Sequence, residues 1–121
     1  GELYVTGRMK DLVIVRGKNH YPQDIELTVR ETHPALQANG AAFSIESSQG
    51  EESLVVVQEV DRKHRDTNLL EEVLPRVLEN LIEVHQVKPA AISFVRQHSI
   101  PLTSSGKIQR QATRAHFMSQ E

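Results

Sequence analysis

The chain has 121 residues, of which 38% are hydrophobic and 25% are charged, a composition typical of one globular domain. Its formal net charge is −2, from 14 basic and 16 acidic residues, which argues against a dedicated nucleic-acid-binding protein. The absence of cysteine excludes disulfides, Cys-ligated zinc, iron–sulfur clusters and thiol catalysis. No apolar run approaches the roughly 20 residues of a membrane-spanning helix, no signal-peptide pattern opens the chain, and we expect a cytoplasmic protein.

The first third of the chain predicts two strands and a helix. Residues 3–6 form a short strand pattern, and the β-branched run at residues 12–15 is typical of a buried strand. Residues 16–19 contain Gly and Asn and predict a turn. A helix is expected to begin at Pro22, where the missing N–H costs nothing, and to end before Pro34, because the residue preceding a proline avoids the α region.

Within this first helix, the side chains divide into two groups. Ile25, Val29 and Thr32 form an apolar stripe that is expected to face the core. Asp24 and Glu26 lie near the positive end of the helix dipole, which their charge complements.

The middle of the chain predicts a hairpin and then a long helix. Residues 41–46 and 53–60 are two β-favouring runs joined by a short turn, which favours an antiparallel pair. Residues 68–84 repeat apolar side chains at helical spacing over four turns, and Asn68 stands at the start as a capping residue. Pro75 lies inside this pattern and predicts either a kink or two helical pieces.

The last third of the chain predicts a strand, a polar loop and a closing helix, at residues 91–95, 98–106 and 108–118. The predicted order is therefore β-β-α-β-β-α-β-α. We expect one α+β domain over residues 1–121, in which helices pack on a small mixed sheet and the chain opens with a β-hairpin.

Two segments carry more special residues than simple connections need. The first, residues 7–22, sets Arg8, Lys10, Arg16 and Lys18 around two glycines. A β-hairpin with a solvated cationic rim also explains this pattern. The six histidines have no metal-binding spacing, and no Gly-x-Ser-x-Gly elbow offers a nucleophile.

The second segment, PLTSSGKIQR at residues 101–110, places three hydroxyls and a glycine before Lys107. It is not a phosphate-binding P-loop, because Pro101 replaces the first glycine and Ile108 replaces the final Ser/Thr. From the residues alone, a Ser-rich turn that caps a helix, with Lys107 solvated, is favoured over a lysine that contacts phosphate or carboxylate oxygens.

Taken together, the two segments resemble a known family. GELYVTGRMKDLVIVRGKNHYPQDIE is similar to the hinge motif of the adenylate-forming superfamily, which includes acyl-CoA synthetases, peptide-synthetase adenylation domains and luciferase. PLTSSGKIQR is similar to the terminal catalytic-lysine motif of the same superfamily. The run Gly17–Pro22, with Tyr21 and Asp24, resembles the fatty acyl-AMP ligases more than the acyl-CoA synthetases.

The resemblance implies a C-terminal lid domain whose large N-terminal domain is not part of this chain, and the start at Gly1 is consistent with a fragment. ATP and Mg²⁺ are the implied cofactors, and their sites are expected mainly on that N-terminal domain. The implied partners are that domain, a fatty acid and the phosphopantetheine arm of an acyl carrier protein, in pathways such as polyketide assembly. The chain by itself is expected to be inactive.

The resemblance also implies roles for individual residues. Lys107 matches the catalytic lysine, which also contacts the nucleotide. Lys10 matches the hinge, and Arg8 matches a nucleotide-binding arginine. The loop that admits the pantetheine arm contains Arg16, Gly17 and Lys18. The residues that support the motifs are Gly7, Asp11, Thr103, Ser105 and Gly106.

Two alternatives stay open at this point. The chain could be the lid of an acyl-CoA synthetase or of an amino-acid adenylation domain, in which case the acyl acceptor differs. It could instead be a catalytically silent module that docks a carrier protein.

Overall fold

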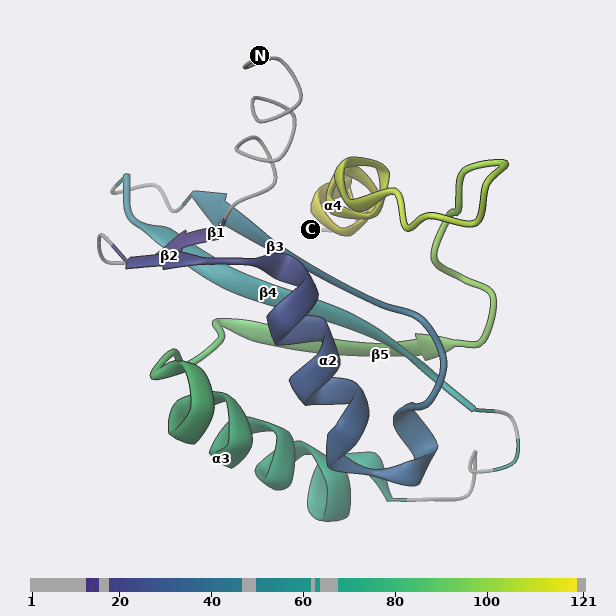
Figure 1. The fold of residues 1–121 in the computed structure, drawn as a ribbon, viewed down its shortest axis with the longest axis horizontal. Helices are drawn as coiled ribbons and strands as arrows, with labels where there is room; N and C mark the ends of the chain where they lie inside the picture. Colours follow the sequence, from purple (N-terminus) through teal and green to yellow (C-terminus); the bar gives the residue numbers. More distant parts are fainter. Residues whose placement is uncertain (1–12, 16–17, 47–49, 62, 64–67, 120–121) are drawn as a thin grey trace.

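The structure is a computed structural model that describes residues 13–15, 18–46, 50–61, 63 and 68–119. Figure 1 shows a twisted sheet with helices α2 and α3 on one side and helix α4 on the other. The predicted strand at residues 3–6 lies outside the described residues.

A short hairpin precedes the main sheet. β1 (Val13–Val15) pairs antiparallel with β2 (Lys18–His20), with Ile14 opposite Asn19. A hairpin is therefore present near the start of the described residues, but it pairs residues 13–15 with residues 18–20. Of the two strands predicted before the first helix, only the one at residues 12–15 is part of it. The expected turn over residues 16–19 is wrong for Lys18 and Asn19, because both are paired with β1 and belong to a strand.

The main sheet has three strands in the order β3-β4-β5. β3 (Gly40–Glu46) and β4 (Glu52–Val60) are antiparallel, as the predicted hairpin requires. β5 (Ala91–Arg96) lies parallel to β4, so the sheet is mixed and the α+β prediction is confirmed. A parallel neighbour needs a long crossover, and the segment between β4 and β5 supplies it with a helix.

The helices begin and end close to the predicted residues. α2 spans Pro22–Thr32 and is followed by a 3₁₀ turn, Pro34–Leu36. A π-helical turn, Leu69–Val73, leads into α3, Leu74–His85. α4 spans Arg110–Ser119, two residues later than the sequence pattern predicts at its start.

Local chemistry accounts for these boundaries. Pro22 occupies the first turn of α2, and Pro34 follows its end. The side chain of Asn68 accepts a hydrogen bond from the N–H of Glu71 at 3.2 Å, as the capping pattern predicts. Pro75 lies in the first turn of α3, just after the π-helical turn, so the predicted division into two helical pieces is confirmed.

The core has one cluster on each face of the sheet. The face under α2 and α3 buries side chains from both helices against alternate residues of β4, including Val56. The opposite face, toward α4, buries Phe43, Val55 and Ile100, with Ile108 and Phe117 packed against them. Because both faces are covered, β4 is buried along most of its length. The residues between β5 and α4 are thus part of the second cluster.

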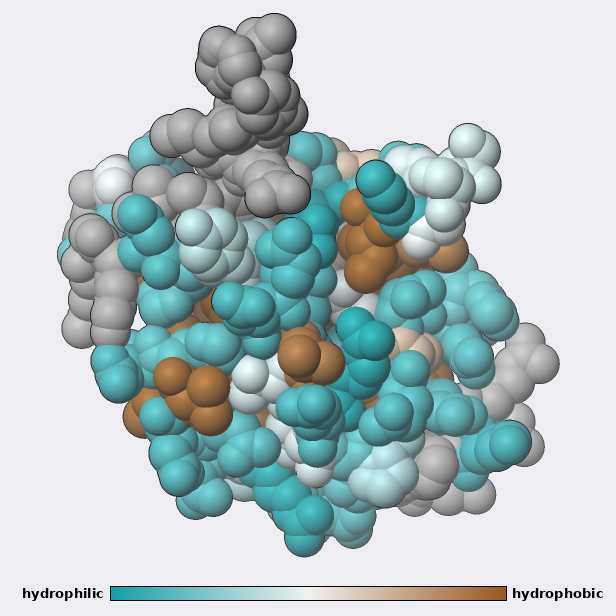
Figure 2. Space-filling view, viewed as in Figure 1, coloured by the Kyte–Doolittle hydropathy of each residue, from teal (hydrophilic) through white to brown (hydrophobic). Residues whose placement is uncertain are grey.

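The face of the molecule drawn in Figure 2 is mainly hydrophilic. Figure 2 shows apolar side chains on one face as separate patches that hydrophilic residues interrupt. In the described residues, no helix has the length and apolar character that crossing a membrane requires.

Candidate functional site

The segment that carries Lys107 folds back on itself between β5 and α4. Leu102 and Ile108 form an isolated antiparallel bridge. The N–H of Gln109 donates to the carbonyl of Pro101 at 3.0 Å, and the Gln109 side-chain amide donates to the carbonyl of Leu102 at 3.1 Å. We call residues 101–109 the lysine hairpin. The predicted polar loop is therefore an ordered turn with its own hydrogen bonds.

At the tip of the lysine hairpin, Thr103 bonds to Lys107 in both directions. The N–H of Thr103 donates to the carbonyl of Lys107 at 2.8 Å, and the N–H of Lys107 donates to Oγ1 of Thr103 at 3.0 Å. Oγ1 of Thr103 also lies 3.0 Å from Oγ of Ser105. Gly106 has a φ of +86°, a conformation that side chains with a Cβ rarely adopt. The motif residues Thr103, Ser105 and Gly106 thus build the turn that presents Lys107.

The side chain of Lys107 is exposed, and it makes no ion pair with any described residue. A free ammonium on a short, ordered turn is available to an anion brought from outside this chain. The interpretation of the segment as a Ser-rich turn is therefore correct for the backbone, but the hydroxyls of Thr103 and Ser105 bond within the turn and α4 begins only at Arg110. It is also compatible with a lysine that acts on phosphate or carboxylate oxygens.

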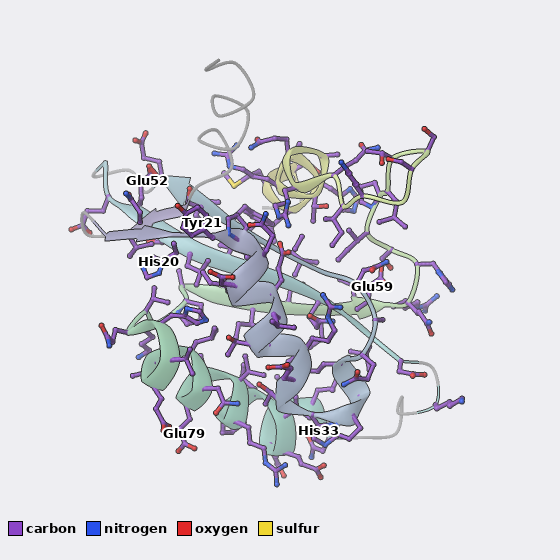
Figure 3. All side chains as sticks on the ribbon, viewed as in Figure 1. His20, Tyr21, His33, Glu52, Glu59 and Glu79 are labelled. Carbon is purple, nitrogen blue, oxygen red and sulfur yellow. The ribbon has the colours of Figure 1, made fainter. Side chains whose placement is uncertain are left out.

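Buried carboxylates hold the chain just before and just after the lysine hairpin. Glu59 of β4 is 1% exposed, and it accepts a hydrogen bond from the N–H of Ile100 at 2.8 Å. In Figure 3, Glu59 lies beside the chain that leaves β5. At the other end, Glu26 of α2 pairs with Arg110, the first residue of α4.

The pair between Glu26 and Arg110 has ideal fork geometry. Nε of Arg110 donates to Oε2 of Glu26, and Nη2 donates to Oε1, both at 2.7 Å. Oε2 of Glu26 also accepts the N–H of Ala42 in β3, at 2.8 Å. The Glu26 side chain is 4% exposed and the Arg110 side chain 17%. Bidentate, charge-assisted bonds of this kind are among the stronger ones in proteins.

Sequence reasoning missed these supporting carboxylates. It assigned Glu26 only an interaction with the positive end of the helix dipole, but Glu26 is buried with Pro22, Ile25 and Val29. Those four positions follow the i, i+3, i+4, i+7 spacing of a buried helix stripe. A carboxylate inside such a stripe indicates a buried partner, because an unpaired buried charge is strongly destabilising.

Half of the first predicted segment, residues 7–12 and 16–17, lies outside the described residues. Lys18 lies in β2. The other predicted hinge, nucleotide and pantetheine-loop positions lie outside the described residues, so their roles stay predictions: Gly7, Arg8, Lys10, Asp11, Arg16 and Gly17.

Three histidines in the described residues, His20, His33 and His85, take part in hydrogen bonds or ring contacts. Nε2 of His85 lies 2.8 Å from Oγ1 of Thr28, and the ring packs edge-on against His20. His33 bonds to Glu72 at 3.1 Å. Among the residues that the structure describes, no group of three or more His, Asp or Glu side chains is placed to hold a metal ion.

Comparison with known proteins identifies the family. Residues 10–121 match the family described as "Disco-interacting protein 2-like, AMP domain". The chain belongs to this family. The match includes the lysine hairpin and all of the described elements.

Relatives of this AMP-domain chain include fatty acid ligases. It is 49% identical over 119 residues to the medium-chain fatty acid–acyl-carrier-protein ligase JamA of Moorena producens (strain JHB), covering 98% of this chain and 20% of that protein. It is 37% identical over 116 residues to the long-chain fatty acid–AMP ligase FadD26 of Mycobacterium marinum (strain ATCC BAA-535 / M), covering 93% and 19%. The resemblance to fatty acyl-AMP ligases is confirmed, and the chain spans about a fifth of the length of these curated relatives.

Solved structures agree on the fold. The AMP-domain chain superposes on the structure of McyG A-PCP complexed with phenylalanyl-adenylate with a TM-score of 0.79. The sequence identity is 18%, and the match covers 91% of this chain and 20% of that one. At this identity the likeness shows a shared fold.

Proposed function

We propose that this chain is the C-terminal lid domain of an ATP-dependent fatty acyl-AMP ligase, and that Lys107 is its catalytic lysine. The observation that carries the proposal is the exposed ammonium of Lys107 on an ordered turn of the motif PLTSSGKIQR. The 49% identity to JamA supports the choice of a fatty acid as substrate and an acyl carrier protein as acceptor. A cytoplasmic location is part of the same proposal.

The proposed reaction joins a fatty acid carboxylate to the α-phosphorus of ATP. A carboxylate oxygen forms the new P–O bond, the bond to the β-phosphate oxygen breaks, and pyrophosphate leaves. Two anions must approach, and negative charge builds on the α-phosphoryl oxygens. The ammonium of Lys107, placed between these oxygens, would lower their repulsion in a site from which water is excluded.

The described residues supply only part of what this reaction needs. Lys107 suits a phosphate, but no described cluster of carboxylates or histidines suits Mg²⁺. In this proposal the metal, the adenine and the fatty acid bind mainly on the large N-terminal domain of the complete ligase. In the same proposal, Lys10 is the hinge, Arg8 contacts the nucleotide, and Arg16, Gly17 and Lys18 line the path of the pantetheine arm.

Replacing Lys107 tests the proposal directly. In the complete ligase, Lys107→Ala is expected to lower ATP–pyrophosphate exchange by roughly 10²–10³-fold, as the loss of other electrostatic stabilisers does. Transfer of the acyl group from preformed acyl-adenylate is expected to survive. Lys88→Ala, at another exposed lysine, is the matched control and should keep normal exchange. Near-normal exchange by Lys107→Ala would rule out the assignment of Lys107.

The acceptor needs a separate assay. Acyl transfer to a phosphopantetheinylated carrier protein, with no product from coenzyme A, is the expected result. Transfer to coenzyme A instead would identify an acyl-CoA synthetase. Activity with neither acceptor, together with no adenylation, would favour a silent docking module.

A further inference from the structure

The Glu26–Arg110 pair joins the two segments that carry the family resemblance. Glu26 belongs to the Pro22–Thr32 helix of the first segment, and Arg110 ends the second. The two residues are 84 positions apart in the chain. Their contact therefore fixes the start of α4 against α2 and β3, and Arg110 lies only three residues after Lys107.

The position of Arg110 at the start of α4 makes the carboxylate important. The positive end of a helix dipole disfavours a cation, and an arginine in the first turn would be repelled there. The negative carboxylate of Glu26 interacts favourably with the positive end of the α4 dipole. It also neutralises the charge of the Arg110 guanidinium. Glu26 is itself held by the N–H of Ala42 in the sheet. The start of α4 is thus tied to the core by a rigid link.

Within the lysine hairpin, Ile108 packs against the second core cluster, and the chain on either side is held by the two buried carboxylates. The tip residues of the hairpin, 102–107, are exposed. One end is held where Glu59 accepts the Ile100 N–H, and the other where Glu26 holds Arg110. The bridge between Leu102 and Ile108 joins the two arms of the hairpin, so the position of its ends also determines where the neighbouring Lys107 lies.

We propose that the Glu26–Arg110 pair positions the ammonium of Lys107 for contact with its substrate. Arg110 and Glu26 are positioning residues in this proposal, which rests on the proposed function of Lys107. Displacing a reacting group by about 1 Å can cost on the order of 10²-fold in rate. Loss of the pair is therefore expected to lower the adenylation rate by more than a reduced fraction of folded ligase would explain.

The test uses three variants of the complete ligase. Arg110→Met keeps an unbranched apolar side chain and removes the guanidinium. The double variant Glu26→Gln/Arg110→Met removes both charges, while the amide oxygen at position 26 still accepts the Ala42 N–H. Arg114→Met is the matched control, because Nε of Arg114 also ties α4 to the sheet, at the carbonyl of Ser44, 2.9 Å away.

Each variant is measured by ATP–pyrophosphate exchange, by transfer from preformed acyl-adenylate, and by thermal unfolding. Arg110→Met leaves a buried carboxylate unpaired and is expected to unfold at a lower temperature. The double variant should unfold close to the wild type, because neutral replacements of a buried ion pair are often tolerated. Its exchange kcat should nevertheless fall by about 10- to 100-fold, with the KM for ATP little changed and transfer intact.

Three outcomes would overturn the inference. Wild-type exchange in the double variant would mean that the pair contributes only stability. An equal loss of exchange in Arg114→Met would mean that any loosening of α4 has the same effect. Normal exchange in Lys107→Ala would overturn the proposed function and this inference together. If Lys107→Ala loses exchange and both Arg110 variants keep it, only the inference fails.

Discussion

The hydroxyl of Thr103 offers a graded test of the lysine hairpin. Thr103→Val keeps the shape of the side chain and removes the oxygen that accepts the Lys107 N–H at 3.0 Å. The two backbone bonds of Thr103, from its own N–H to the carbonyl of Lys107 and from the N–H of Gly106 to its carbonyl, persist. The exposed contact between Oγ1 of Thr103 and Oγ of Ser105 is lost as well, and water can replace it. The substitution therefore weakens the turn without removing it.

The size of the effect follows mainly from the loss of the hydrogen bond that the N–H of Lys107 donates to Thr103. Such a bond contributes about 0.5–1.5 kcal/mol, which changes the ratio of ordered to open hairpin by about twofold to tenfold. If Lys107 acts from the ordered form, the adenylation rate falls by at most about the same factor, because only the competent fraction reacts. The loss should be far smaller than that of Lys107→Ala.

ATP–pyrophosphate exchange by the complete ligase is the assay. Thr103→Ser, which keeps the hydroxyl, should restore most of the rate, and Ser104→Ala on the neighbouring exposed residue should leave it unchanged. An unaltered rate in Thr103→Val would show that the hydroxyl does not order the turn. A loss as large as that of Lys107→Ala would mean that the hydroxyl touches the reacting groups, and the structural reasoning would be wrong.

Two further predictions concern stability and are measured by urea unfolding of the chain. Leu81→Ala, at a fully buried position, should cost about 2–5 kcal/mol, while Leu70→Ala, at a side chain 70% exposed, should stay within about 0.5 kcal/mol. Equal costs would contradict the packing described. Gly40→Ala should cost about 1–3 kcal/mol, because the new Cβ would overlap the buried side-chain amide of Gln58. Adding Gln58→Ala should relieve that overlap, and strict additivity of the two costs would refute it.

The parts of the fold that the sequence predicts correctly are those decided within a few residues. Pro22 and Pro34 set the ends of α2, and Asn68 caps the turn before α3. These signals are steric or involve one short hydrogen bond, so they do not depend on the rest of the chain. The motif around Lys107 is predicted as a turn for the same reason.

Other features depend on partners that are distant in the chain. Lys18 and Asn19 have the composition of a turn, but pairing with β1 makes them a strand. The strand order β3-β4-β5 follows from which strands meet, and local propensity does not specify this. The role of Glu26 needs Arg110, 84 positions later, so one stretch of helix could not reveal it. The presentation of Lys107 was predictable, whereas the residues that hold it were not.

The long span of these contacts has a consequence for the order of folding. The links that hold the lysine hairpin and α4 join residues 41, 70 and 84 positions apart. Closing such loops costs chain entropy that only the completed sheet and helices repay. The ammonium of Lys107 is thus expected to reach its native position late in folding, after α2, β3 and β4 have assembled. A peptide of residues 101–110 would contain the motif sequence. It would lack the helices and strands that orient Lys107.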